Sequence, residues 1–379
     1  EALKDSHHIK GLFSFWKSNL SSSQILLKFK LYVVTFCSQV ITSEEFVRQF
    51  TKYTEPELDP DVLPPVIHII TSLFNLESMF DKASSSSLPA LSTLVRDFKK
   101  LKMCGKALIE QIYSLFSYWN VLLIADTLLA DSHNTFYVKH RTVETVLMYL
   151  KAKKKRVNHQ NSKFIAKTIL GGFAECSKIE KLERDHLKYI QLGATLLTLL
   201  LRNSAVHELY LDQAPDLFEL FEKLGDDYIA KSSLSILLGQ MVARLKLDML
   251  PYIDDVMTSL FAFSKSVREL YSQSFKKGSL PMGSLIQSYQ ALINESGDMI
   301  SPYLNTMIED LISIEANEYN NLIKSTLATM AKKVPTRLLL EPTLSTHEAI
   351  LEMRLTRNEI IRLLHLVNHL CMNLDVETT

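Results

Sequence analysis

The amino-acid sequence predicts an all-α protein, a HEAT/armadillo-like α-solenoid of stacked antiparallel helix pairs. Three observations lead to this fold class. Glycine and proline are scarce, with 10 and 11 copies in 379 residues, against an average usage of about 7% and 5%. A proline-led pattern of apolar residues at helical spacing recurs along the chain. No segment combines sustained apolar–polar alternation with the turn dipeptides that bound strands.

The scarcity of glycine and proline excludes folds that depend on tight turns. These two residues build hairpins, turns and phosphate-binding loops, so the composition argues against β-sandwiches, barrels and Rossmann folds. Hydrophobic residues make up 47% of the chain, which is ample for a large buried core. The composition therefore favours helices joined by short connections.

The recurring pattern places apolar residues at positions +2, +5, +6, +9 and often +10 after a proline. Proline is tolerated in the first turn of a helix, where its missing N–H has no intrahelical partner. Apolar residues three and four apart then form one stripe on one helix face. Each copy is expected to be a helix that begins at a proline and buries one side. The copies begin at Pro64, Pro89, Pro215, Pro251 and Pro302.

A second apolar stripe follows each of the last two copies and predicts a partner helix, over residues 285–293 and 322–331. The last three copies begin 36 (251 − 215) and 51 (302 − 251) residues apart, which brackets the roughly 40–47 residues of HEAT and armadillo units. An irregular helical bundle is the alternative. We expect a single continuous helical-repeat domain over residues 1–379, taken from a longer chain because the sequence begins at Glu1 rather than at Met.

Breaks between helices are expected at short polar or glycine-containing segments. These segments are residues 51–63, the serine run 84–87, the polar segment 159–162, the Gly171-Gly172 pair and the Lys276-Lys277-Gly278 turn. None of them is long enough to be a domain linker.

The bulk charge and the cysteines narrow the class of protein further. The formal net charge is zero, so no global attraction to nucleic acid or membrane follows. Four cysteines lie far apart without a CxxC pair, which fits a reducing compartment and gives no zinc signature. The longest apolar run, residues 192–201, is about half of what a membrane span needs. We therefore expect no membrane partner.

No motif in the sequence indicates catalysis, so we expect a non-enzymatic protein with no cofactor, metal site or small-molecule substrate. Gly171-Gly172 lacks the lysine and spacing of a phosphate loop. His365 and His369 have the four-residue spacing of a metal pair but not the HExxH pattern, and packing or surface histidines are the simpler interpretation.

Residues 151–167 (KAKKKRVNHQNSKFIAK) form the strongest local feature, with seven lysines or arginines and no acid. Such runs are typical of nuclear localisation signals or phosphate-binding patches, and a solvated loop or helix face is the alternative. The candidate residues are Lys151, Lys153, Lys154, Lys155, Arg156, Lys163 and Lys167. A weaker basic cluster consists of Arg96, Lys99, Lys100, Lys102 and Lys106.

Residues 291–342 carry a family resemblance. They read ALINESGDMISPYLNTMIEDLISI followed, after a few residues, by NNLIKSTLATMAKKVPTRLLLEP. A helix end, an SPYL segment and a following helix that runs into V-P-x-R-x-L-L resemble the U3 small nucleolar RNA-associated protein 10 family. The matching positions are Ser301, Pro302, Tyr303, Leu304, Leu327, Ala328, Val334, Pro335, Arg337, Leu338 and Leu339. Thr336 stands where that family often has a second proline.

The resemblance implies a non-enzymatic HEAT-repeat scaffold of the small-subunit processome, acting in ribosome biogenesis and pre-rRNA processing in the nucleus and nucleolus. Its partners would be other protein subunits of a large complex, with contact to pre-rRNA or a small nucleolar ribonucleoprotein left open. An unrelated HEAT-type adaptor is the alternative function, for example a nuclear transport receptor or a kinase-complex scaffold.

Overall fold

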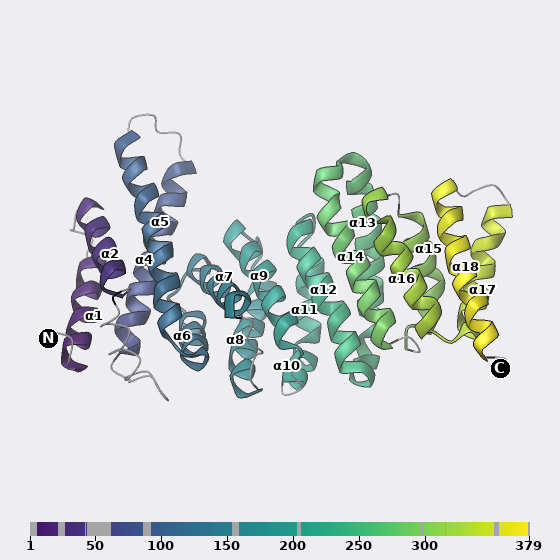
Figure 1. Cartoon of the computed structure of the whole chain (residues 1–379), viewed down its shortest axis with the longest axis horizontal. Helices are drawn as coiled ribbons and strands as arrows, with labels where there is room; N and C mark the ends of the chain where they lie inside the picture. Colours follow the sequence, from purple (N-terminus) through teal and green to yellow (C-terminus); the bar gives the residue numbers. More distant parts are fainter. Residues whose placement is uncertain are drawn as a thin grey trace. The chain divides into compact units, whose positions relative to one another are not determined.

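The computed structural model describes residues 6–21, 27–41, 43, 62–85, 92–153, 159–202, 206–296, 299–314, 316–351 and 356–377. Every regular element within these ranges is a helix, so the predicted all-α class is confirmed. The helices belong to two compact units, and Figure 1 follows them along the chain. Unit 1 comprises residues 1–169 and 184–189, and unit 2 comprises residues 170–183 and 190–379. Whether the chain is one continuous domain stays a prediction.

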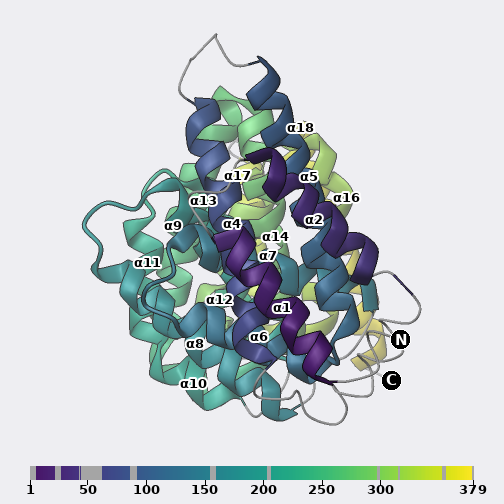
Figure 2. The same ribbon diagram turned by 90° about the vertical axis from the view of Figure 1, so that its left-hand side faces the viewer.

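Unit 1 stacks its helices in two rows. In one row α1 packs on α4 and α4 on α6, and in the other α2 packs on α5 and α5 on α7. Figure 2 shows α1 and α2, the first helix of each row, nearest the viewer. The rows hold together because α1 also packs on α2, α4 on α5 and α6 on α7. The helices are α1 (Ser6–Ser21), α2 (Leu27–Ile41), α4 (Leu63–Ser85), α5 (Ser92–Leu115), α6 (Tyr118–Ala130) and α7 (Phe136–Lys153), while α8 (His159–Lys178) and α9 (Arg184–Leu200) contribute to both units.

Unit 2 repeats this arrangement. One row runs through α12, α14, α16 and α18, each packed on the next, and α11 packs on α13 and α15 on α17 in the other. The α-helices are α10 (His207–Asp212), α11 (Ala214–Lys223), α12 (Tyr228–Leu245), α13 (Ile253–Gln273), α14 (Phe275–Ser296), α15 (Leu304–Ser313), α16 (Asn320–Lys333), α17 (Thr336–Leu351) and α18 (Arg357–Glu377). Between them lie the 3-10 helices η2 (Lys246–Tyr252), η3 (Ser301–Tyr303) and η4 (Asn317–Tyr319).

Consecutive helices of unit 2 form antiparallel pairs. A single residue, Ser274, separates α13 from α14, and the two helices pack on each other, so the chain must reverse direction there. The close approach of neighbouring helices depends on small residues. A Cβ on Gly239 of α12 would lie 3.1 Å from Ser288 of α14. Antiparallel pairs stacked in two rows are the HEAT/armadillo-like α-solenoid that the sequence predicts.

Proline marks helix starts as expected. Pro64 and Pro215 are the second residues of α4 and α11, Pro302 lies in η3 directly before α15, and Pro251 lies two residues before α13. Pro89 lies outside the described residues. The apolar stripes after these prolines are buried, including Val66, Ile69, Ile70, Leu217, Leu220, Val256, Met257, Leu260, Met307, Ile308 and Leu311. The predicted partner helices are α14 and α16, whose stripes are buried at Leu285, Ile286, Tyr289, Leu292, Ile293, Ile323, Leu327 and Met330.

Three predicted breaks are wrong. Helix α8 begins at His159 and continues through the polar segment 159–162 and through Gly171-Gly172. A glycine costs about 1 kcal/mol in a helix interior, but burial of Ile169, Leu170 and Phe173 around the pair outweighs this cost. The turn expected at residues 276–278 lies at Ser274, and Gly278 is already helical. Most of segment 51–63 and residues 86–87 lie outside the described residues.

Candidate interaction surfaces

The basic run at residues 151–167 borders the connection between α7 and α8. Lys151 is exposed near the end of α7, and Lys163 and Lys167 are exposed on α8. Lys154, Lys155 and Arg156 lie outside the described residues, as does the side chain of Lys153. The described part of the run is thus three solvent-facing lysines, and its use for phosphate binding or nuclear localisation stays a prediction.

The weaker basic cluster separates into free and paired side chains. Lys99, Lys100 and Lys106 are exposed on α5. Lys102 instead lies 2.7 Å from Asp81 Oδ1 and 3.6 Å from Glu77 Oε1, both on α4. The side chain of Arg96 lies outside the described residues. Lys102 therefore joins α4 to α5 rather than serving a partner.

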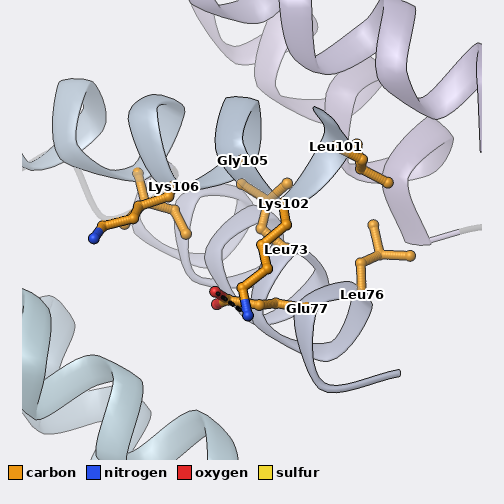
Figure 3. A pocket seen from close by; sticks show the side chains of 8 residues that line it. Leu73, Leu76, Glu77, Leu101, Lys102, Gly105 and Lys106 are labelled. Atoms are coloured by element: carbon orange, nitrogen blue, oxygen red, sulfur yellow. Dashed lines mark ion pairs between the residues drawn. The ribbon is translucent and has the colours of Figure 1, made fainter. Parts of the chain in front are cut away.

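Lys102 lines a small cavity between α4 and α5. Figure 3 shows Lys102 extending from α5 to the carboxylate of Glu77, with Leu73 and Leu76 beside it. The cavity holds about 10 Å³, and a single water molecule needs roughly 10–15 Å³. This cavity therefore has no room for a small-molecule ligand.

Arg141 of α7 completes the charged cluster between α4, α5 and α7. Its Nε donates to Glu77 Oε2 at 2.9 Å, and its Nη1 pairs with Glu144. Burial would lower the pKa of Arg141, but Glu77 and Glu144 outweigh that effect and raise it. Breaking a buried ion pair costs about 3–5 kcal/mol because one charge is left unpaired. The cluster thus fixes three helices of unit 1 in one arrangement.

His140 is the most perturbed histidine described. It lies on α7 with 2% of its surface exposed, and its Nε2 is 3.5 Å from Asp185 Oδ1. Burial lowers its pKa to about 3, with the charges of Lys188 and Arg141 acting in the same direction. The imidazole is therefore neutral at physiological pH. It lines neither of the two cavities described here.

An open cleft of about 570 Å³ lies in unit 2 beside α13, and Met282 of α14 and Ser313 of α15 line its other sides. Arg268 at its wall lies 3.0 Å from Asp310 Oδ1 and donates to Ser313 Oγ at 2.7 Å. Asp310 also accepts a hydrogen bond from the buried Tyr289 hydroxyl at 2.8 Å. The remaining charged wall residues, Lys265 and Glu269, have opposite signs. This cleft selects neither anions nor cations by charge.

A buried arginine connects three helices of unit 2. Arg362 of α18 is 1% exposed, and its Nη1 donates to the carbonyls of Ile312, at 2.8 Å, and Ile314. Its Nε donates to Asn320 Oδ1 at 3.0 Å. The last carbonyls of a helix have no intrahelical donor, so Arg362 completes the end of α15 and ties it to α16.

The described residues were compared with the requirements of a metal site and of a membrane-spanning helix. Within them, no group of three or more histidine, cysteine or acidic side chains is placed to hold a metal ion. The rings of His365 and His369 lie 4.6 Å apart on α18, and burial lowers the pKa of His365. Among the helices that the structure describes, none is long and apolar enough to cross a membrane.

Two exposed aromatic side chains, on α6 and α8, are not signalled by any motif in the sequence. Trp119 of α6 is 37% exposed and Phe164 of α8 is 58% exposed. Phe164 lies between Lys163 and Lys167 in the sequence, so a helical projection of this run would have placed all three on one face. Trp119 has no comparable sequence signal, because no lysine or arginine lies near it in the sequence.

Comparison with protein-family models and with curated proteins gives no match. Among solved structures, the chain is similar to the crystal structure of Kap121p, with 11% identity and a TM-score of 0.36 over 95% of this chain and 41% of that chain. It is similar to Kap121p bound to Pho4p with 9% identity and a TM-score of 0.32, over 98% and 50% of the two chains. The chain spans half or less of these structures. Similarity at this level carries no conclusion about function.

Proposed function

We propose that the chain is a non-enzymatic scaffold that binds other proteins on the surfaces of its helix rows. Exposed apolar side chains one helical turn apart support this function. Tyr32 and Phe36 form such a pair on α2, as do Leu340 and Leu344 on α17. Single exposed apolar residues are ordinary, but adjoining ones favour protein contacts. Stacked helices give extended surfaces on which such contacts are spread.

We further propose that this scaffold acts in small-subunit ribosome biogenesis, in the nucleus and nucleolus. The support is the sequence resemblance at residues 291–342. These residues form the end of α14, α15, α16 and most of α17. Leu304, Leu327, Val334 and Leu339 are buried there, so much of the shared pattern maintains the repeat. Two of the matching residues, Pro302 and Arg337, are exposed and available to a partner.

Affinity purification of the tagged protein from nuclear extract tests both the scaffold function and the ribosomal role. The purification is done with and without ribonuclease and is read by mass spectrometry and RNA sequencing. We expect small-subunit processome proteins together with the 5′ part of the ribosomal RNA precursor. Partners that survive ribonuclease would be direct protein contacts. Recovery of transport cargo or kinase subunits instead would refute the ribosomal assignment, and recovery of no stable protein partner would refute the scaffold.

A further inference from the structure

We propose that α6 and α8 of unit 1 form a surface for single-stranded nucleic acid, on which Trp119 and Phe164 stack bases and Lys163 and Lys167 contact phosphates. The inference deepens the proposed scaffold function and rests on it for the identity of the nucleic acid in the cell. The binding itself is a property of the purified chain.

Helices α6 and α8 lie side by side. The hydroxyl of Thr168 on α8 donates to Asp126 Oδ1 on α6 at 2.5 Å. The Tyr149 hydroxyl near the end of α7 donates to the carbonyl of Phe116, just before α6, at 3.4 Å. The chain leaves α7 at Lys153 and begins α8 at His159, so α8 starts at the end where α6 starts. The two helices therefore run in the same direction.

This register brings the two exposed aromatic rings to neighbouring levels. Trp119 precedes Asp126 by seven residues, which is two helical turns, and Phe164 precedes Thr168 by four, which is one turn. Both lie on the helix faces that carry the Asp126–Thr168 contact, because residues four and seven apart share a face. At 1.5 Å per residue their levels differ by about 4.5 Å along the helix axes.

The charge on this surface favours an anionic ligand. Lys163 and Lys167 flank Phe164 and are exposed, and neither forms an ion pair among the residues that the structure describes. Asp126 accepts the hydroxyl of Thr168 and keeps its negative charge, so two lysines face one carboxylate and the sum of these three charges is positive. Residues 151–167 contain no acidic residue. Phosphates are thus the complementary group, since phosphate contacts by lysine need no base sequence.

The aromatic rings favour nucleic acid over an acidic peptide. Exposed rings beside cations form the stacking platforms of single-strand binders, where each base has a π-face to offer. The other tryptophan of the chain, Trp16, is buried, so exposure is not a general property of tryptophan here. An acidic peptide would satisfy Lys163 and Lys167 but would leave the two rings without stacking partners.

The test is fluorescence anisotropy of the purified chain with labelled oligo(U) and oligo(dT), supported by quenching of tryptophan fluorescence. We expect Trp119→Ala combined with Phe164→Ala to weaken binding about 5- to 150-fold per lost stack. Lys163→Gln with Lys167→Gln should lower the slope of log affinity against log salt by about 1.4, at about 0.7 per lost phosphate contact. Circular dichroism checks the fold of each variant, because Trp119 is only 37% exposed and part of its ring is packed.

Matched control variants remove exposed lysines and an exposed aromatic ring from helices other than α6 and α8. Lys99→Gln with Lys100→Gln removes two exposed lysines from α5, and Tyr32→Ala removes an exposed ring from α2; both should bind as the unaltered chain does. Equal losses in the controls, no binding at low salt, or equal competition by polyglutamate would overturn the proposal, the last in favour of an acidic protein. Stronger binding of oligo(U) than of oligo(dT) would identify RNA as the ligand. Because this assay needs no cellular partner, its failure would leave the protein-binding scaffold standing.

Discussion

Acidification from pH 7 to pH 5 is expected to destabilise unit 1 through His140. This side chain is buried on α7, and its pKa falls to about 3, first through burial and then through Lys188 and Arg141. An unfolded chain would titrate this histidine near its ordinary value of about 6.5. Between these two values the unfolded state binds a proton that the folded state does not.

The sign and size of the effect follow from this difference. Stability rises with pH wherever the unfolded state binds more protons, so the contribution of His140 is fully present above pH 6.5 and is lost progressively as the pH falls toward 3. Each pH unit below 6.5 costs about 1.36 kcal/mol. The loss between pH 7 and pH 5 is therefore about 2 kcal/mol.

Tryptophan fluorescence during urea unfolding isolates this effect, because both tryptophans, Trp16 and Trp119, belong to unit 1. The free energy of unfolding should be measured at pH 7 and pH 5 for the unaltered chain and for His140→Phe, which keeps a ring but cannot titrate. His133→Gln, at an exposed histidine, is the matched control. The reasoning fails if His140→Phe retains the full pH dependence of the unaltered chain.

Three further substitutions test contacts in unit 2, each read from the urea midpoint by far-UV circular dichroism. Arg362→Ala should cost about 3–5 kcal/mol, because Asn320 Oδ1 and the carbonyls of Ile312 and Ile314 would each lose a charged donor; a loss below 1 kcal/mol would show that water replaces the guanidinium. Gly278→Ala should cost about 1–3 kcal/mol because a Cβ there would lie 2.5 Å from Tyr271 Cα, and an unchanged midpoint would contradict the close approach of α13 and α14. Asp227→Ala should cost about 1 kcal/mol, since its Oδ1 caps α12 by accepting the N–H of Ala230 at 2.8 Å; Asp227→Asn, which keeps the acceptor, should restore most of it.

The proline-led helices and their buried faces follow from the amino-acid sequence alone. Proline position and three–four apolar spacing are local properties of a helix, so Pro215 and the stripe Val256, Met257 and Leu260 could be assigned without tertiary information. The same local reasoning was wrong at Gly171-Gly172, where α8 continues and buries Ile169, Leu170 and Phe173 on either side of the pair.

Which polar and aromatic side chains face solvent depends on how the helices pack, and local sequence does not reveal it. Lys99 and Lys102 look alike in sequence, yet Lys102 is paired to Asp81 and Glu77 while Lys99 faces solvent. Trp119 and Phe164 are 45 residues apart in sequence (164 − 119), and the contact between α6 and α8 brings them to neighbouring levels. Helical periodicity relates residues that lie within a few positions of each other in the sequence. Charge pairing and exposure depend instead on which helices, distant in the sequence, pack against the residue.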